Sequence, residues 1–249
     1  MATLGIIPAR YASTRFPGKP LAILDGKTII HRVYQQCQLC DSIDELIVAT
    51  DDERIAGHVH NFGGLAVMTR ADHVNGTSRC AEALKNYELI SKIAYDVVIN
   101  IQGDEPYIHP DMINKVVSLF NDPNTRIGTL VKRIHSEEEL FNPNVVKVLS
   151  DKNNKAMIFS RNPMPYNRDV EKGSWLKKTE FYKHIGLYGF RKDTLIEVTK
   201  LKPSRLELAE KLEQLTWMEN GYPVTVDYTD HDSAGIDTPE DLLKLTNKS

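Results

Sequence analysis

Cysteine is scarce in this chain, with three in 249 residues. An odd number of cysteines in a chain this long does not predict a disulfide framework, and reduced thiols suit the cytosol. Cys37 and Cys40 form a C-x-x-C pair, but no second pair completes a structural zinc site. Together with Ile30 and Val33 they fall at helical spacing, so we interpret both as core residues of a helix.

Long apolar runs and an excess of positive charge are also missing. No stretch approaches the roughly 18 apolar residues that span a bilayer, and residues 4–8 are followed at once by Arg10 and Arg15, unlike a secretory leader. The formal net charge of −3 disfavours a generally basic surface. We therefore expect a soluble, cytoplasmic protein that binds neither nucleic acid nor membrane and holds anions by local positive charge.

The first hundred residues alternate between strand and helix patterns. A hydrophobic content of 41% fits one large α/β domain. Alternating elements predict βαβ units with a parallel sheet, whose ligands gather at the carboxyl ends of the strands. We expect buried strands at 4–7 (stopping at Pro8), 45–50, 65–69 and 96–101, helices at 28–40, from 51 and at 77–87, and polar loops at 8–20, 50–53, 70–79 and 102–106.

The second half of the chain follows a different pattern. Short strand-like runs at 127–132, 145–149, 156–160 and 184–190 predict an insertion, at about 125–200, that extends the same sheet. Residues 204–220 predict one strong helix with a Ser204–Glu207 capping box, and Gly221 as its stop. On this helix Glu207, Glu210 and Gln214 would share a face. A strand at 224–228 and a closing helix capped by Thr238 complete the chain.

A loop rich in cations directly follows the first strand. Residues 8–20, PARYASTRFPGKP, combine Arg10, Arg15 and Lys19 with Gly, Ser and Thr. A polyphosphate needs such charge-assisted donors together with backbone N–H groups that can approach closely. The loop is not a Walker A motif, because Ser13 and Pro20 stand at positions where that motif needs Gly and Ser or Thr. A solvated basic loop is the alternative, and the position after a buried strand favours phosphate binding.

Two aspartates follow predicted buried elements at the same edge. Asp104 lies near the end of the run VVINIQGDEP, and Asp237 lies in GIDTPED before the last helix. Magnesium takes one or two carboxylates together with substrate phosphates, so the pair could hold it. Spacing alone favours a turn role for Asp104 and a capping role for Asp237.

The segment PARYASTRFPGKPL resembles the N-terminal signature of the 3-deoxy-manno-octulosonate cytidylyltransferases, within the sugar nucleotidyltransferases. The blocks VATDDERI, MTRADHVNGTSR, VVINIQGDEP, FNPNVVKV, IFSR, YKHIGLYGF, LELAEKLEQL and GIDTPED match that family in order over nearly the whole chain. The resemblance implies a single nucleotidyltransferase domain over 1–249 with a three-layer, mostly parallel Rossmann-like sheet of the nucleotide-diphospho-sugar transferase type. It also implies an inserted dimerisation segment at about 125–200 and a homodimer.

The resemblance further implies an activity and its residues. CMP would pass from CTP to 3-deoxy-manno-octulosonate (KDO), with release of pyrophosphate, giving CMP-KDO for lipopolysaccharide biosynthesis. Asp104 and Asp237 would bind Mg²⁺ and, with Arg10 and Lys19, form the catalytic set. The nucleotide-binding residues would be Pro8, Ala9, Arg10, Arg15, Lys19, Asn75, Gly76, Thr77, Arg79 and Gln102, and the sugar-binding residues Arg161, His184, Tyr188, Glu210 and Gln214.

Two positions depart from the family pattern. Asn75 stands where the family has serine, and Thr216 where it has arginine. They keep open a sibling transferase that activates an 8-amino octulosonate or another acidic 2-keto sugar, and composition and spacing do not name the base. A catalytically silent nucleotide-binding module is a further alternative, which the intact Lys19, Asp104 and Asp237 argue against.

Overall fold

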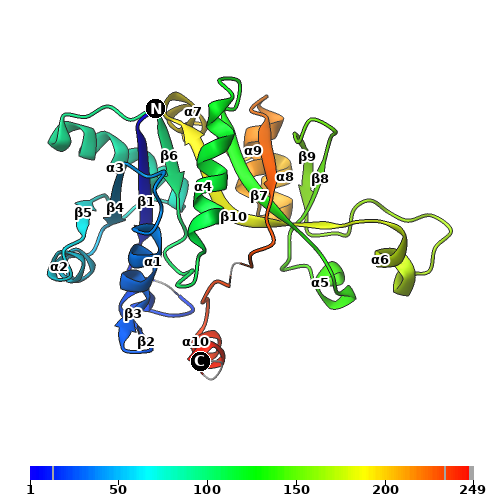
Figure 1. Cartoon of the computed structure of the whole chain (residues 1–249), viewed down its shortest axis with the longest axis horizontal. Coiled ribbons are helices and arrows are strands. Elements are labelled where there is room, and N and C mark those ends of the chain that lie inside the picture. Colours follow the sequence, from blue (N-terminus) through cyan, green and yellow to red (C-terminus); the bar gives the residue numbers. More distant parts are fainter. Residues whose placement is uncertain (13, 233, 247–249) are drawn as a thin grey trace.

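A mixed sheet forms the centre of the fold (Figure 1). The computed structural model describes residues 1–12, 14–232 and 234–246, so Ser13 of the expected phosphate loop lies outside it. Within those ranges the sheet has nine strands, seven of them in the order β11-β7-β10-β6-β1-β4-β5, with β8 on β10 and β9 on β8. The strands, including a separate β2-β3 pair, are β1 (Thr3–Ala9), β2 (Ile23–Leu24), β3 (Lys27–Thr28), β4 (Glu45–Thr50), β5 (Leu65–Met68), β6 (Val97–Asn100), β7 (Ile127–Arg133), β8 (Lys147–Ser150), β9 (Ala156–Ser160), β10 (Tyr182–Arg191) and β11 (Val224–Tyr228).

Helices cover both faces of this sheet, which gives three layers (Figure 1). The helices are α1 (Ile29–Cys37), α2 (Glu53–Asn61), α3 (Gly76–Ser91), α4 (Pro110–Ser118), α5 (Glu137–Phe141), α6 (Trp175–Lys178), α7 (Lys192–Val198), α8 (Arg205–Glu210), α9 (Glu213–Glu219) and α10 (Pro239–Thr246). Alternation along β1 divides the core, because Ile7 packs with α1, α2 and α4 while Leu4 and Ile6 pack with α3, α7 and α9. The expected three-layer, mostly parallel α/β fold is confirmed, with β10 as the antiparallel strand of the seven-strand path.

The C-x-x-C cysteines both belong to the core, as predicted, but α1 ends at Cys37 and Cys40 lies just after the helix. Cys37 and Cys40 are both buried in the cluster that includes Ile30 and Val33 of α1. Burial raises the pKa of the Cys40 thiol to about 12 and that of Cys37 well above its usual value. Thiols held protonated in this way suit packing and neither redox nor metal chemistry.

The structure corrects two expected elements. The first strand does not stop at Pro8 but continues to Ala9, with Pro8 in register with Ala49 of β4. Residues 204–220 are not one helix, because Lys211 adopts a left-handed backbone, with φ of 55°, between α8 and α9. The expected common face of Glu207, Glu210 and Gln214 is therefore wrong, since Gln214 lies on the second helix.

Residues 125–200 extend the central sheet, as expected. β7 and β10 lie inside it, while β8, β9, α5 and α6 project to one side (Figure 1). A small separate cluster of Ile134, Leu140, Trp175 and Phe181 stabilises this projection, which we call the arm. The arm joins the main sheet through β8 on β10, so it is not an independent layer.

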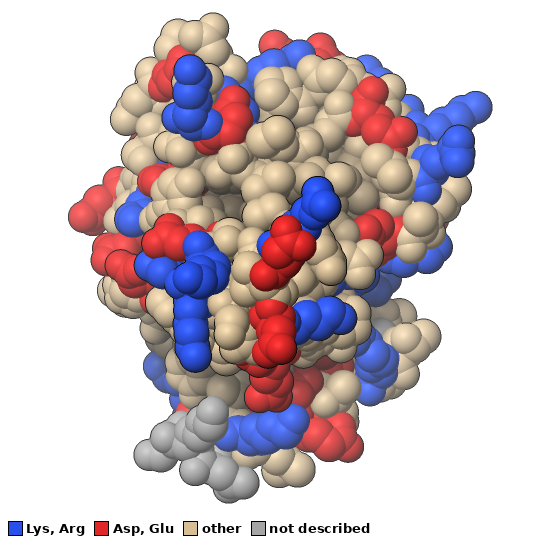
Figure 2. Space-filling model, turned by 90° about the vertical axis from the view of Figure 1, so that its right-hand side faces the viewer, with Lys and Arg blue, Asp and Glu red and all other residues tan. Residues whose placement is uncertain are grey.

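Surface charge matches the near-neutral composition. On the face over the arm, Figure 2 shows Lys and Arg interspersed with Asp and Glu, with no uniformly basic expanse among the described residues. Nor is any helix in the described ranges both long and apolar enough to cross a membrane.

Candidate active site

A cavity of about 240 Å³ lies at the carboxyl ends of β1 and β6. This is the sheet edge at which the sequence places the polar loops. The cavity joins segments that lie far apart in the chain. Its lining consists of Pro8, Ala9, Arg10, Arg15, Lys19, Pro20, His73, Val74, Asn75, Gly76, Arg79, Gln102, Gly103, Asp104 and Asp237.

Lys19 is the centre of an ion-pair network in this cavity. Its Nζ donates to Oδ2 of Asp104 at 2.6 Å and lies 3.6 Å from Oδ1 of Asp237. Arg15 pairs with both carboxylate oxygens of Asp237, at 3.1 and 3.2 Å. The loops that carry Asp104 and Asp237 are also in contact, because the N–H of Ile236 donates to the Asp104 carbonyl at 2.9 Å. The expected convergence of Lys19, Asp104 and Asp237 is confirmed.

The donor set fits a hard divalent cation. Asp104 and Asp237 offer carboxylate oxygens, which magnesium prefers. Both carboxylates already lie near the Lys19 ammonium group, so the positive charge between them in this structure is that of Lys19. An incoming triphosphate would supply new partners for Lys19 and Arg15 and leave these oxygens for a metal.

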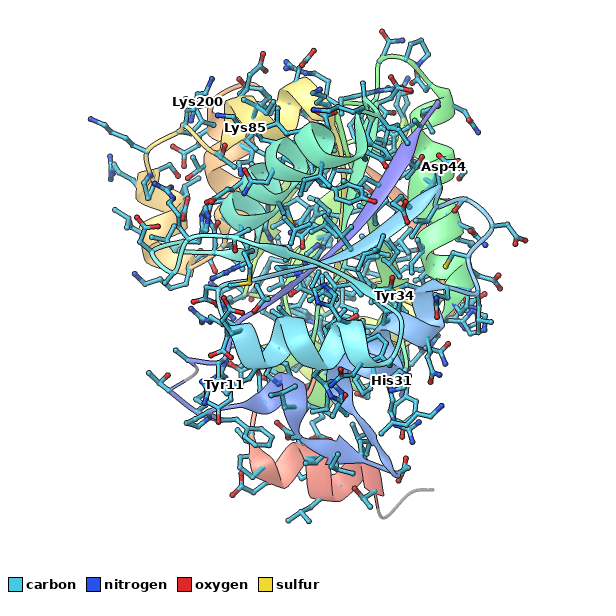
Figure 3. The ribbon with its side chains drawn as sticks, turned by 90° about the vertical axis from the view of Figure 1, so that its left-hand side faces the viewer. Tyr11, His31, Tyr34, Asp44, Lys85 and Lys200 are labelled. Carbon is cyan, nitrogen blue, oxygen red and sulfur yellow. The ribbon has the colours of Figure 1, made fainter. Side chains whose placement is uncertain are left out.

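The cation-rich loop is held in shape by Tyr11. The N–H of Gly18 donates to the Tyr11 carbonyl at 2.9 Å, and Gly18 has a positive φ of 72°. A Cβ on Gly18 would lie 3.1 Å from the Tyr11 ring. Figure 3 shows Tyr11 beside one end of α2. There the Arg54 guanidinium packs over the Tyr11 ring, with Cζ 3.4 Å from the ring centroid. Gly18 therefore turns the chain so that Lys19 points into the cavity.

The turn at the start of α3 borders the cavity on another side. Asn75 caps the helix, with its side chain accepting from the Ser78 N–H at 2.9 Å. The Arg79 side chain is buried, donates to Thr69 at 2.6 Å and lies 3.2 Å from an Asp51 carboxylate oxygen. Gly76 allows close approach to β1, because a Cβ there would lie 3.2 Å from Cγ of Pro8.

Glu213 fixes this turn by accepting hydrogen bonds from two of its side chains, and the sequence patterns did not predict this role. Its two carboxylate oxygens accept from Asn75 Nδ2 at 2.8 Å and from the Thr77 hydroxyl at 2.9 Å. Thr77 thus faces Glu213 and does not line the cavity. Burial raises the pKa of Glu213 to about 7. The one sequence signal was its place beside Gln214 in the LELAEKLEQL block, since its partners lie about 140 residues away.

Gly103 is a second residue whose role appears only in the structure. A Cβ at this position would lie 2.8 Å from the Pro8 carbonyl oxygen, so the Asp104 loop can pass β1 only with glycine here. The neighbouring Gln102 donates through Nε2 to the carbonyl of Gly186 at 3.1 Å. This contact ties the carboxylate loop to β10.

The expected sugar residues lie beyond the lining of the 240 Å³ cavity and form two groups. Glu210 accepts from the Ser160 hydroxyl at 2.7 Å and from the Arg161 N–H at 2.9 Å. The Arg161 guanidinium donates to the carbonyls of Glu210 and Pro143. Arg161 and Glu210 are therefore brought together at the base of the arm.

The second group is aromatic and buried. The His184 and Tyr188 rings lie 5.0 Å apart, and Tyr188 also packs on Trp217 at 5.1 Å. Burial lowers the pKa of His184 to about 3, so its imidazole is neutral, and Nε2 lies 3.1 Å from the Thr129 hydroxyl. Within the described ranges the Tyr188 hydroxyl has no hydrogen-bond partner. Gln214 is buried on α9 nearby.

Comparison with known proteins identifies the family of this chain. The chain matches the cytidylyltransferase family over residues 4–228. It is 54% identical over 248 residues to the 3-deoxy-manno-octulosonate cytidylyltransferase of Parabacteroides distasonis, covering 98% of this chain and 96% of that protein. With the protein of the same name from Bacteroides thetaiotaomicron it shares 53% identity, over 97% of this chain and 96% of that one. This chain belongs to the 3-deoxy-manno-octulosonate cytidylyltransferase family.

Solved structures agree with the membership. CMP:2-keto-3-deoxy-manno-octonic acid synthetase complexed with CTP superposes with a TM-score of 0.89 at 37% identity, covering 100% of this chain and 98% of that one. A 4-diphosphocytidyl-2C-methyl-D-erythritol synthase from Anaerococcus prevotii shares the fold alone, at 14% identity and a TM-score of 0.59 over 99% of this chain and 97% of that one. The expected family and Rossmann-like fold are both confirmed.

The two departures from the family pattern have structural roles in this cytidylyltransferase. Asn75 caps α3 and contacts Glu213. Thr216 is buried on α9, where its hydroxyl donates to the Glu207 carboxylate and accepts from the Ser204 N–H. Only half of the capping box expected at Ser204 forms, because the Glu207 N–H donates to the Ser204 hydroxyl at 3.2 Å while the Ser204 N–H donates to Thr216 and not to Glu207. Thr216 thus joins the two short helices.

Proposed function

We propose that this chain transfers CMP from CTP to KDO, releases pyrophosphate and so produces CMP-KDO for lipopolysaccharide biosynthesis. The observation that carries the proposal is the network of Lys19, Asp104 and Asp237 in a cation-lined cavity of a family member. A relative that superposes at a TM-score of 0.89 is a CMP-KDO synthetase complexed with CTP. A silent nucleotide-binding module would not require this set of paired charges.

The cavity residues divide the work by charge. Arg10, Arg15 and Lys19 bind the triphosphate, because three cations at one strand edge offset much of its negative charge. Asp104 and Asp237 would hold Mg²⁺, which neutralises phosphate oxygens as charge spreads during transfer. The anomeric hydroxyl of the sugar attacks the α-phosphorus in line and pyrophosphate leaves. Positioning and electrostatic stabilisation supply the catalysis, with no covalent enzyme intermediate.

The sugar acid binds on the side of the cavity where Arg161, His184, Tyr188, Glu210 and Gln214 lie. The buried Tyr188 hydroxyl supports this placement, because an unsatisfied buried hydroxyl costs about 1–3 kcal/mol and a sugar oxygen would satisfy it. Arg161 can pair with the sugar carboxylate if it releases its two carbonyl partners. Neutral His184 provides a hydrogen-bonding group without adding charge.

The protein acts in the cytoplasm as a homodimer formed through the arm. Support comes from the outer strand β9, where Met157 is 60% exposed although it lies on a strand of the main sheet. Apolar side chains exposed on an edge strand favour association. Light scattering of Met157→Asp should show a monomer and of the wild type a dimer. Leu243→Asp on α10, equally exposed, is the matched control that stays dimeric.

A substrate screen tests the activity. Four nucleoside triphosphates are combined with KDO, 8-amino KDO and a nonulosonic acid, with Mg²⁺ present, and pyrophosphate release is measured. The expected result is release with CTP and KDO at a kcat/KM at least about tenfold above every other combination. A higher value with another sugar would assign this chain to a sibling transferase. No release from any combination would refute the proposed activity.

A further inference from the structure

A row of three hydrogen-bonded side chains lies along one wall of the catalytic cavity. His73 lines the cavity and contacts Ser78 and Glu82 of α3. Its Nδ1 lies 3.1 Å from the Ser78 hydroxyl oxygen, and its Nε2 donates to the Glu82 carboxylate, because an ionised carboxylate can only accept. The proposed reaction uses none of these three side chains.

Glu82 gathers donors from the loop that precedes α3. Besides His73, it accepts from the Arg70 N–H at 3.2 Å and from Arg70 Nε at 3.3 Å. Burial would raise the pKa of Glu82, but the hydrogen bonds from His73 and Arg70 hold it below its ordinary value. Glu82 is therefore an ionised acceptor that fastens residues 70–73 to α3.

His73 is the side chain by which this loop enters the structure. Its side chain is 6% exposed, whereas the side chains of Arg70 and Asp72 are largely exposed and Val74 is 85% exposed. Few other side-chain contacts are therefore in a position to fix the loop. The place of residues 70–74 depends on the contact between His73 and Glu82.

The same loop leads into the turn that borders the nucleotide cavity. Val74, Asn75 and Gly76 line the cavity directly after His73. Ser78 connects His73 to this turn, because its hydroxyl donates to the Asn75 carbonyl at 3.1 Å and its N–H donates to Asn75 Oδ1 at 2.9 Å. A displaced His73 would thus move the cavity wall formed by residues 74–76.

We propose that His73 is a positioning residue for the nucleotide, which fixes the turn at residues 74–76 and through it the affinity for CTP. The inference rests on the proposed function of the cavity. His73 acts through the turn, because both of its ring nitrogens are engaged by α3. Arg161 and Glu210, proposed for the sugar, lie instead at the base of the arm, so the effect should concern CTP and not the acidic sugar.

Calorimetric titration with CTP and Mg²⁺, in the absence of sugar, tests this role. His73→Leu should weaken CTP binding about tenfold, because the loop loses its contact with Glu82. Glu82→Gln keeps an acceptor for Nε2 and should weaken binding by only about threefold. The double variant should bind CTP no more than about twofold more weakly than His73→Leu, because both changes act on one contact. His60→Leu, at an exposed histidine of α2, is the matched control and should bind CTP as the wild type does.

Steady-state kinetics separate positioning from a general loss of structure. The KM for CTP should rise with the loss of affinity, whereas the KM for KDO should stay within about twofold of the wild type. The proposal is overturned if His73→Leu binds CTP as tightly as the wild type, if both KM values rise together, or if the effects of the two changes multiply in full. If His73→Leu does not fold, Glu82→Gln decides, and unchanged CTP affinity in that variant overturns the proposal.

The calorimetric readout also keeps this inference distinct from the proposed activity. A wild type that binds CTP but releases no pyrophosphate would refute the transfer reaction, and the binding of CTP to the His73 and Glu82 variants would still decide the positioning role. A wild type that binds no CTP would overturn both.

Discussion

The charged cavity around Lys19 and the aromatic region around Tyr188 hold polar groups in opposite ways. In the cavity, partly exposed ions neutralise one another, as Lys19 and Asp104 do at 2.6 Å. In the aromatic region, burial keeps His184 uncharged and leaves the Tyr188 hydroxyl without a partner in the described structure. This difference indicates that the cavity is preorganised to bind a charged ligand. The aromatic region is preorganised for a ligand that completes its hydrogen bonds.

The largest effect should come from breaking the charged network. Asp104→Asn removes a carboxylate that pairs with Lys19, so we expect kcat to fall by about a hundredfold or more. Pyrophosphate release in saturating CTP and KDO measures this. Asp193→Asn, at an exposed position in the first turn of α7 and outside the cavity lining, is a surface carboxylate control. Wild-type turnover of Asp104→Asn in Mg²⁺ would refute the metal assignment.

Glu213 joins the two regions and predicts a pH dependence of stability. Its pKa in the folded protein, about 7, lies above the ordinary value of 4.5, so the folded state keeps a proton that the unfolded state loses. Protonated Glu213 therefore contributes about 3 kcal/mol to the free energy of unfolding below pH 4.5, and this contribution is lost as the pH rises to about 7. Denaturant unfolding at pH 5 and pH 8 measures it.

Glu213→Gln supplies the control for that measurement. Glutamine can still accept from Asn75, but it does not titrate, so the variant should lose less stability than the wild type between the two pH values. An identical loss in both proteins would contradict the burial of an ionisable Glu213.

Tyr188→Phe sharpens the comparison from the aromatic side. Removing the buried hydroxyl should raise the KM for KDO about tenfold and leave the KM for CTP unchanged. The folded protein should become more stable by about 1 kcal/mol, because an unsatisfied hydroxyl disappears. Tyr182→Phe, at the half-buried start of the same strand, is the control for a general effect of tyrosine loss. A rise in the KM for CTP instead would place Tyr188 at the nucleotide.

The smallest expected effect tests the break between α8 and α9. Lys211→Gly should stabilise the protein by up to about 1 kcal/mol, because glycine adopts the left-handed backbone without strain. In a continuous helix the same change would destabilise by about 1 kcal/mol, as we expect for the control Lys85→Gly inside α3. Thermal unfolding of both variants gives the sign. Destabilisation by Lys211→Gly would instead support one continuous helix over residues 204–220.

Much of the charged cavity could be predicted from the sequence. Lys19, Asp104 and Arg79 each follow a buried run that reads as a strand, and parallel strands end at one edge. The aromatic region could not be predicted in this way, because His184 and Tyr188 have the same pattern as core residues. Only the family resemblance assigns them to the site, and no pattern in the sequence indicates that Lys211 ends α8 and separates it from α9.

The sequence by itself determined the alternation of strands and helices, the cation-rich loop and the family, because these depend on local periodicity and short contiguous blocks. Tertiary structure alone decided that Glu213 holds the turn at the start of α3, that Gly103 must pass the Pro8 carbonyl, and that His109 stacks on His231. The physical reason is that each of these contacts joins groups far apart in the chain, and only the packing of the sheet brings them within bonding distance.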